Sequence, residues 1–120
     1  SPIPGLVKWL NETNQLKVAT DPQKLAPLAA HYLLEAKHRN GQPRDPVARF
    51  HLNNGALVEA VHADADISAN GLALSRGAMV NYRYDLTKIS TNHEAYANQQ
   101  SVVASKAVKV LAEQIPPVGA

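Results

Sequence analysis

Apolar side chains in the first third of the chain recur at helical spacing. Residues 21–41 carry apolar positions three, four and seven residues apart: Leu25, Leu28, Ala29, Tyr32, Leu33 and Ala36. Asp21 suits the N-cap and Pro22 the first helical position, so we expect an amphipathic helix that ends before Gly41. Pro27 lacks an amide donor and crowds the preceding turn, so this helix either bends at Pro27 or begins there.

Two later segments alternate side chains between two faces, which is the pattern of a strand. In residues 56–64, one set of alternating positions is Val58, Ala60 and His62, and the other is Leu57, Glu59 and Val61. In residues 78–85, one face carries Ala78, Val80, Tyr82 and Tyr84, and the other Met79, Asn81, Arg83 and Asp85. Residues 67–71 predict a polar connection. We therefore expect a two-stranded antiparallel unit.

The residue patterns near both ends of the chain also predict helices. Residues 6–10 predict a short helix and residues 11–20 a loop. Near the other end, Thr91 and Glu94 have the spacing of a capping box. Five later apolar positions share one helical stripe: Tyr96, Val103, Ala107, Val110 and Leu111. These signals predict one helix that stops before Pro116-Pro117.

A histidine lies inside a short helix whose two ends carry capping signals. Asp45 can accept hydrogen bonds from the first free N–H groups, and Pro46 suits the first helical position. Gly55 can adopt the left-handed conformation that ends a helix. His51 is therefore expected to be held in a fixed orientation. An imidazole with an unperturbed pKa near ~6.5 can act as an acid or a base at neutral pH.

Composition limits the classes of protein to consider. The chain has 120 residues, of which 45% are hydrophobic, enough for one core but too few for two ordinary domains. The formal net charge is +2 and basic residues are scattered, so we expect no nucleic acid partner. The absence of cysteine excludes disulfides and thiolate metal sites and is typical of a reducing compartment. No apolar run approaches the ~20 residues of a membrane span, so we expect a cytoplasmic protein without membrane partners.

Three motifs in a fixed order carry a resemblance to a known family. They are Ser1-Pro2-Ile3-Pro4-Gly5-Leu6, then Asp-Pro-Val-Ala-Arg-Phe-His-Leu-Asn-Asn-Gly-Ala at 45–56, then Gly-Ala-Met-Val-Asn-Tyr-Arg-Tyr-Asp-Leu at 77–86. Together they closely resemble malonyl-CoA decarboxylase, over nearly the whole chain but only thinly between Asn11 and Ala26. The resemblance implies an α/β (α+β) fold. This would be the C-terminal part of a GNAT-type acyltransferase fold, with two or three strands flanked by helices.

The resemblance also implies that residues 1–120 are the C-terminal portion of a catalytic domain that is incomplete alone. In the family, an all-helical oligomerisation domain and a Gly-rich loop that binds the CoA phosphates lie before the position matching Ser1. This chain has no such Gly-rich loop. Two strands are also rarely stable as an isolated sheet. The expected partners are malonyl-CoA, the upstream part of the same protein and further copies in a homo-oligomer.

Decarboxylation of a malonyl thioester needs no separate cofactor, because the thioester carbonyl accepts the electrons released as carbon dioxide leaves. The protein must stabilise an enolate and return a proton. The resemblance implies that Ser1 and His51 form the catalytic pair, with Ser1 at the thioester oxygen and His51 as proton donor. In the rival mechanism, His51 activates Ser1 as a nucleophile. Tyr84 matches a family tyrosine that lines the active site, or else packs as a strand aromatic beside Val80.

Other patterns leave alternatives open. His62, Asp64 and Asp66 would lie on one side of a strand, as metal ligands do, but exposed strand faces show the same alternation and we expect no metal. The basic residues at 37–39 and Arg49 either approach CoA phosphates or are solvated charges. An acyl-CoA-binding or acyltransferase module of the same fold is the alternative to a decarboxylase.

Overall fold

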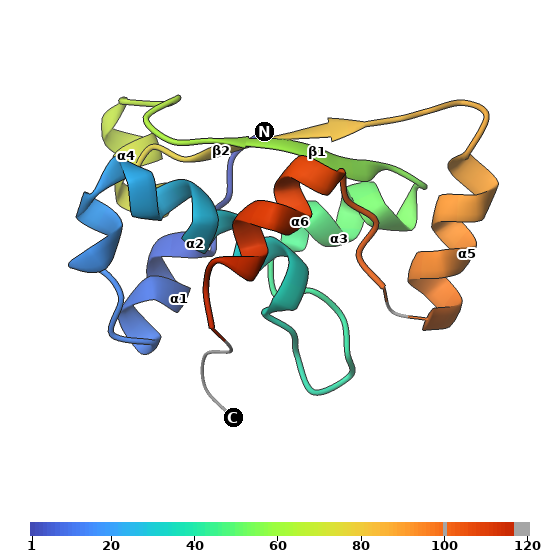
Figure 1. Ribbon diagram of the computed structural model, residues 1–120, viewed down its shortest axis with the longest axis horizontal. Helices are drawn as coiled ribbons and strands as arrows, with labels where there is room; N and C mark the ends of the chain where they lie inside the picture. The colour runs from blue at the N-terminus through green and yellow to red at the C-terminus, as the bar shows by residue number, and fades with distance from the viewer. Residues whose placement is uncertain (100, 117–120) are drawn as a thin grey trace.

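A two-stranded antiparallel sheet runs along one side of the molecule, and helices pack against it (Figure 1). The computed structural model describes residues 1–99 and 101–116. Strands β1 (Leu57–His62) and β2 (Met79–Arg83) confirm the predicted pair and the α+β class. The helices in these ranges are α1 (Leu6–Glu12), α2 (Pro22–Glu35), α3 (Pro46–Asn53), α4 (Ala69–Ser75), α5 (Ile89–Gln99), α6 (Lys106–Glu113) and the 3-10 helix η1 (Val18–Thr20).

Extended segments from the two ends of the chain border both edges of the sheet. Beside β2, the Ser1 amino group donates to the Val80 carbonyl at 2.9 Å, and the Val80 N–H donates to the Ser1 carbonyl at 3.0 Å. Beside β1, the Val58 N–H donates to the Val103 carbonyl at 2.9 Å, and the Ser105 N–H donates to the Val58 carbonyl at 2.9 Å. These bonds pair main-chain groups that an open sheet edge would leave unpaired.

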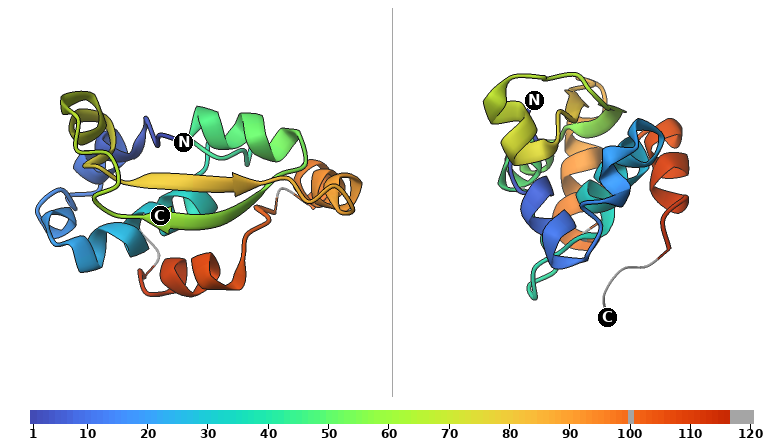
Figure 2. Two further views of the ribbon diagram at one scale, coloured as in Figure 1. Left: turned by 90° about the horizontal axis from the view of Figure 1, so that it is seen from above. Right: turned by 90° about the vertical axis from the view of Figure 1, so that its left-hand side faces the viewer.

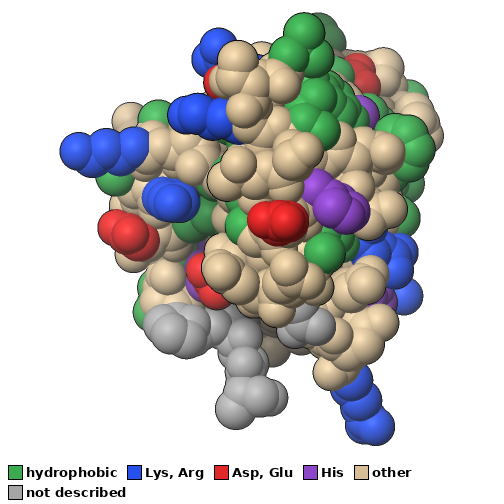
Figure 3. Space-filling view, turned by 90° about the vertical axis from the view of Figure 1, so that its right-hand side faces the viewer, with side chains coloured by type: hydrophobic (Ala, Val, Ile, Leu, Met, Phe, Trp, Pro, Cys, Tyr) green, Lys and Arg blue, Asp and Glu red, His purple; other side chains and the backbone are tan. Residues whose placement is uncertain are grey.

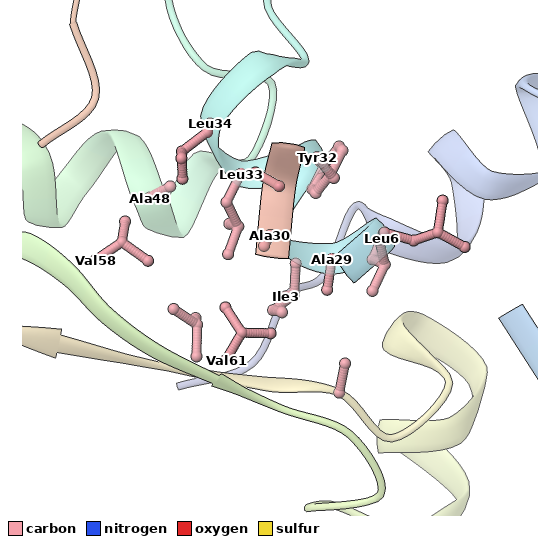
Figure 4. Packing of buried hydrophobic residues seen from close by; sticks show 14 of the residues in the cluster. Ile3, Leu6, Ala29, Ala30, Tyr32, Leu33, Leu34, Ala48, Val58 and Val61 are labelled. Carbon is pink, nitrogen blue, oxygen red and sulfur yellow. The ribbon is translucent and has the colours of Figure 1, made fainter. Parts of the chain in front are cut away.

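The hydrophobic core lies where α2 packs against β1 and α6. Figure 4 shows Val58 and Val61 facing α2, from which Ala30 and Leu33 approach the sheet, with Ile3 beside them. Four of these side chains are fully buried, and Val61 is 8% exposed. Burial of this apolar surface is the main force that holds the helices under the sheet.

Helix α2 follows the predicted start. It begins at Pro22, and Oδ1 of its N-cap Asp21 accepts a hydrogen bond from the Gln23 N–H at 2.9 Å. Pro27 lies inside the helix and is buried in the core, so the alternative start at Pro27 is wrong. The helix ends before Gly41, as expected.

The single helix predicted near the C-terminal end is wrong, because two helices form there. Helix α5 begins before Thr91, so the capping box does not mark its start. Val103 belongs to the extended segment beside β1 rather than to a helical stripe. Ser105 then caps α6, its Oγ accepting a backbone hydrogen bond at 3.2 Å. Helix α6 ends before Pro116, as expected, and Pro117 lies outside the described residues.

A bulge interrupts the alternation predicted for β1. The pairing with β2 shifts register between Val58 and Ala60, which leaves Glu59 as an extra residue on this strand. Val58 and Val61 are consequently both buried, although strict alternation would put them on opposite faces. The predicted division of β1 into two faces is therefore wrong beyond the bulge. In β2 the alternation holds, with Val80 buried between exposed or half-buried neighbours.

Two segments predicted as connections contain short helices. Helix α1 continues to Glu12 and η1 follows, so residues 11–20 are only partly a loop. In the polar connection 67–71, Oγ of Ser68 accepts a hydrogen bond from the Gly71 N–H at 3.0 Å and caps α4. Across the described ranges, every helix falls short of the length and apolar character needed to cross a lipid bilayer.

Gly55, which follows the α3 helix, combines a left-handed backbone with a close neighbour. Its φ is 85°, and a Cβ at this position would lie 2.7 Å from the carbonyl oxygen of Ile89. We expect Gly55→Ala to lower the free energy of unfolding by about 2–4 kcal/mol, from backbone strain and overlap together. Urea unfolding measures this loss.

Gly77→Ala is the matched control for Gly55→Ala. Gly77 also has a left-handed backbone, with φ of 88°, but the nearest atom to an added Cβ is 3.3 Å away. We expect this variant to lose only about 1–2 kcal/mol, the cost of the backbone conformation. Equal losses for the two glycines would show that overlap with Ile89 contributes nothing.

Candidate active site

The capped helix predicted around His51 is confirmed as α3. Asp45 is its N-cap, and Asp45 Oδ2 accepts a hydrogen bond from the Ala48 N–H at 2.8 Å. Pro46 is the first helical residue, and Gly55 has the left-handed conformation expected beyond the helix end. His51 lies in the last turn, on the part of α3 that faces the end of β2. The capping residues of α3 therefore determine the position of the His51 backbone.

Two tyrosines of β2 and its extension hold the His51 ring. The Tyr84 hydroxyl lies 2.6 Å from His51 Nδ1, within hydrogen-bond distance. Tyr82 stacks against the imidazole, with ring centroids 4.3 Å apart and an interplanar angle of 21°. Phe50 meets the imidazole edge-on, at 5.2 Å between centroids, although 63% of Phe50 is exposed. The structure thus brings His51 and Tyr84 into direct contact.

The surroundings of His51 disfavour its protonated form. Desolvation lowers the pKa of the imidazole, and the positive charge of the Ser1 amino group lowers it further. No hydrogen bond from the described part of the chain occupies His51 Nε2. The imidazole is therefore anchored through one nitrogen, with the other available.

Ser1 lies on the side of β2 where α3 packs. Figure 2, in its view from above, shows the N-terminus between β2 and the start of α3. Ser1 pairs with Val80, which is two residues before Tyr82 on the strand. The Ser1 side chain is exposed at this edge. Ser1 therefore lies beside the strand whose extension carries Tyr84, the residue that contacts His51.

Two residues that support this site were not among the sequence-predicted candidates. The sequence placed Tyr82 on the same strand face as Tyr84, and this shared face could have indicated that Tyr82 also lies near His51. Asp45 was recognised as a helix cap, yet its complete burial has no local sequence signal. Asp45 Oδ1 and the Tyr82 hydroxyl are both buried without a hydrogen-bond partner in the described structure.

The other sequence-level candidates lie apart from this arrangement. His62 Nε2 is 3.3 Å from the Asn81 amide nitrogen, and Asp66 instead accepts a hydrogen bond from the Ser68 N–H. Nowhere in residues 1–99 and 101–116 do three or more ligating side chains form a metal-binding cluster. The basic residues at 37–39 are exposed. On the α5 side, Lys and Arg side chains are scattered among other surface atoms rather than joined in a stripe (Figure 3).

A cavity between α2 and α6 does not contain the predicted catalytic residues. It has a volume of about 570 Å³ and lies between α2 and α6, with His31 and Ala112 in its wall. A smaller cavity, beside α3, is lined by Arg49, Phe50 and Tyr96. Ser1, His51 and Tyr84 line neither one. The contact between His51 and Tyr84 therefore lies outside both cavities.

Comparison with known proteins decides the family. The family model described as malonyl-CoA decarboxylase C-terminal domain matches residues 8–117. The chain belongs to the malonyl-CoA decarboxylase family. The membership predicted from three ordered motifs is thereby confirmed. The model begins after the Ser1 motif but includes the whole of α3 and β2.

Relatives within the malonyl-CoA decarboxylase family show how much of their length this chain represents. The mitochondrial malonyl-CoA decarboxylase of Anser anser anser is 40% identical over 101 residues, which cover 84% of this chain and 19% of that protein. The mitochondrial enzyme of Mus musculus is 37% identical over 107 residues, covering 89% of this chain and 21% of that protein. The chain spans about a fifth of the length of these curated relatives.

Solved malonyl-CoA decarboxylase structures share the fold. The crystal structure from Rhodopseudomonas palustris matches with a TM-score of 0.86 and 36% identity, covering 93% of this chain and 32% of that chain. The structure from Agrobacterium vitis matches with a TM-score of 0.84 and 37% identity, covering 92% of this chain and 34% of that chain. The arrangement of helices around β1 and β2 is therefore one that the family uses.

Proposed function

We propose that this chain contributes to the decarboxylation of malonyl-CoA to acetyl-CoA and carbon dioxide, together with the remaining part of a malonyl-CoA decarboxylase. Family membership supports the reaction, and the fraction of the relatives' length that the chain spans supports the need for a further part. The expected CoA phosphate loop would belong to that further part. Homo-oligomer formation, a cytoplasmic location and the relation to the GNAT-type fold stay predictions.

His51 is the proposed proton donor. As carbon dioxide leaves, the electrons of the broken carbon–carbon bond move into the thioester carbonyl and form an enolate. In the imidazolium form, His51 donates Nδ1–H to the Tyr84 oxygen and delivers the Nε2 proton to the α-carbon of the enolate. The neutral ring that remains regains a proton from solvent. A lowered pKa makes the imidazolium a stronger acid, which suits this transfer.

Ser1 is proposed to stabilise the enolate oxygen. Its hydroxyl would donate a hydrogen bond to the thioester oxygen, where negative charge develops as the carboxylate leaves. The pairing of Ser1 with Val80 supports this role, because it fixes the serine main chain beside the strand that carries Tyr82. The rival role, in which His51 activates Ser1 as a nucleophile, would form a covalent acyl-enzyme.

The single observation that carries the proposal is the 2.6 Å contact between His51 Nδ1 and the Tyr84 hydroxyl, in a chain of this family. A hydrogen bond at Nδ1 limits rotation of the ring and leaves Nε2 available for the reaction. Histidine on an exposed helix usually lacks such an anchor. The contact therefore supports a ring held for chemistry rather than one that only packs.

Carbon dioxide release tests the proposed reaction. We define the assembled enzyme as the Rhodopseudomonas palustris relative with its matching segment replaced by this chain. The assembled enzyme should release labelled carbon dioxide from carboxyl-labelled malonyl-CoA and form one acetyl-CoA for each, whereas the isolated chain should not. Folded enzyme that binds malonyl-CoA without release would favour an acyl-CoA-binding module. Transfer of acetyl groups to amines would favour an acyltransferase.

A further inference from the structure

A cavity of about 370 Å³ lies beside α3, the helix that carries His51. Its wall is formed by the turn at 40–44, by α3 and by α5, through Gln42, Pro46, Arg49, Phe50, Asn53 and Tyr96. A second cavity of about 180 Å³ adjoins it, because Gln42, Asn53 and Tyr96 line both. We call the two together the α3–α5 cavity. Among the described residues that line it, Arg49 is the one cation and none is acidic.

The Arg49 guanidinium has no anionic partner in the described part of the chain. The ion pairs found there join Arg44 to Glu12 at 2.8 Å and Arg83 to Glu59 at 3.4 Å, and no side-chain hydrogen bond holds Arg49. Arg49 is half-buried, so it has also lost part of its contact with water. A charge in this condition favours an anion that replaces the lost water.

The other polar groups of the α3–α5 cavity can also donate hydrogen bonds. Gln42 and Asn53 carry side-chain amides, each with N–H donors. Burial raises the pKa of the Tyr96 phenol, against an opposite effect of the Arg49 charge, so its hydroxyl keeps its proton at neutral pH. A cation surrounded by neutral donors suits a phosphate group, whose oxygens accept several hydrogen bonds and can take two from one guanidinium.

Phe50 connects the α3–α5 cavity to the proposed active site. Residues two positions apart on an α-helix are turned by about 200° from each other, so Arg49 and His51 leave α3 on nearly opposite sides. Phe50 comes between them in the sequence. Its ring meets the imidazole edge-on, with centroids 5.2 Å apart, and it also lines the cavity. One aromatic side chain therefore borders both the imidazole and the cavity.

The position of Arg49 selects among the anionic groups of malonyl-CoA. The malonyl carboxylate is bonded to the carbon that His51 is proposed to protonate, whereas Arg49 faces away from His51. A cation that held this carboxylate would also stabilise the ground state more than the transition state, in which the charge moves to the thioester oxygen. The phosphates lie at the nucleotide end of the substrate, away from the reacting carbon. They are the anions that fit this position.

We propose that the α3–α5 cavity is a phosphate-binding site in which Arg49 holds a phosphate group from the nucleotide end of malonyl-CoA. The group is either the 3′-phosphate of the ribose or the pyrophosphate, which share the chemistry that Arg49 recognises. Arg49 acts in substrate binding, and His51 in proton transfer. This inference rests on the proposed function, because it assigns a subsite for the proposed substrate.

Equilibrium binding to the assembled enzyme tests the site, with CoA, dephospho-CoA and pantetheine as probes. We expect Arg49→Gln to weaken CoA binding ~10- to 100-fold in calorimetry, the effect of losing charged hydrogen bonds. If the cavity holds the 3′-phosphate, dephospho-CoA, which lacks this group, should bind the variant and the unmodified enzyme equally. If it holds the pyrophosphate, the variant should lose the same factor for both nucleotides. Pantetheine, which has no phosphate, should bind both enzymes equally in an NMR titration.

Two further variants separate phosphate binding from a structural role of Arg49. Arg49→Lys keeps the charge but not the paired N–H groups, so it should retain part of the lost CoA affinity. Arg76→Gln is the matched control, because Arg76 is also half-buried but lines neither part of the α3–α5 cavity. It should leave CoA binding unchanged. The affinity of Arg49→Gln for CoA should also depend less on salt concentration than that of the control.

The results that would overturn the proposal are distinct from failure of the proposed reaction. Unchanged CoA affinity in Arg49→Gln, or equal weakening of CoA and pantetheine, would remove the phosphate site. If Arg49 only offsets the buried charge of Asp45, its loss would lower the thermal midpoint and leave CoA affinity intact. Binding needs no turnover, so an enzyme that depends on Arg49 for CoA but releases no carbon dioxide would contradict the proposed function alone. If Arg49→Gln does not fold, Arg49→Lys decides the matter with the same probes.

Discussion

Replacing His51 with alanine is expected to lower kcat of the assembled enzyme ~100- to 10,000-fold, the usual contribution of a positioned general acid. The imidazole contacts Tyr84 at Nδ1 and stacks on Tyr82, so its removal leaves no other group in that position to return the proton. KM for malonyl-CoA should change little, because the lost group acts after substrate has bound. Initial rates of acetyl-CoA formation measure both constants.

His62→Ala is the matched control for His51→Ala. His62 is exposed at the end of β1 and contacts Asn81 rather than the tyrosines. This variant should keep the full rate. Undiminished turnover by the His51 variant would remove the imidazole from the mechanism, whereas a large loss restricted to the His62 variant would direct attention back to the metal alternative at His62, Asp64 and Asp66.

Replacing Ser1 with alanine is expected to lower kcat ~100- to 1,000-fold, the loss typical for one donor to a developing oxyanion. The main-chain bonds between Ser1 and Val80 do not involve the hydroxyl, so the substitution should leave the strand edge intact. Thermal unfolding of the variant should therefore match the unmodified protein while turnover falls. Stopped assays of carbon dioxide release compare the two rates.

Mass spectrometry separates the two roles considered for Ser1. If Ser1 only donates a hydrogen bond, its side chain stays unmodified during turnover. If Ser1 is the nucleophile, it accumulates an acyl group whenever hydrolysis of the acyl-enzyme is slow. We expect no acyl adduct on Ser1 in rapidly quenched samples. Ser90→Ala, at an exposed serine in α5, is the control and should keep the full rate. A fully active Ser1→Ala variant would contradict the proposed role.

The parts of the fold that the sequence predicted well are those with local causes. The α3 helix is predicted by Asp45, Pro46 and Gly55, and each of these residues acts on its immediate neighbours. The alternation of β2 is predicted for the same reason, because successive side chains of a strand point to opposite faces. Such signals do not depend on where the rest of the chain lies.

The incorrect predictions have non-local causes. The sequence around Val103 has the spacing of a helix, but this segment instead forms a main-chain hydrogen bond with Val58. Because Val58 is far away in the sequence, the residues next to Val103 do not indicate this pairing. The bulge at Glu59 likewise depends on the partner strand. For the candidate site, His51 and Tyr84 came from motifs in the sequence. The complete burial of Asp45 is a property of the packed molecule, and only the structure reveals it.

The bonds between Ser1 and Val80 join residues 79 positions apart, and those from Val58 to Val103 and Ser105 also close long segments. Closing such loops carries an entropic cost that short-range helices avoid. During refolding we therefore expect α2 and α3 to gain order early and the borders of the sheet to form late. A partly folded chain, with its helices formed but the sheet borders not yet paired, would have much of its native helix content while Ser1 is still separated from His51. In refolding of the assembled enzyme, recovery of activity should accordingly lag behind recovery of the far-ultraviolet dichroism signal.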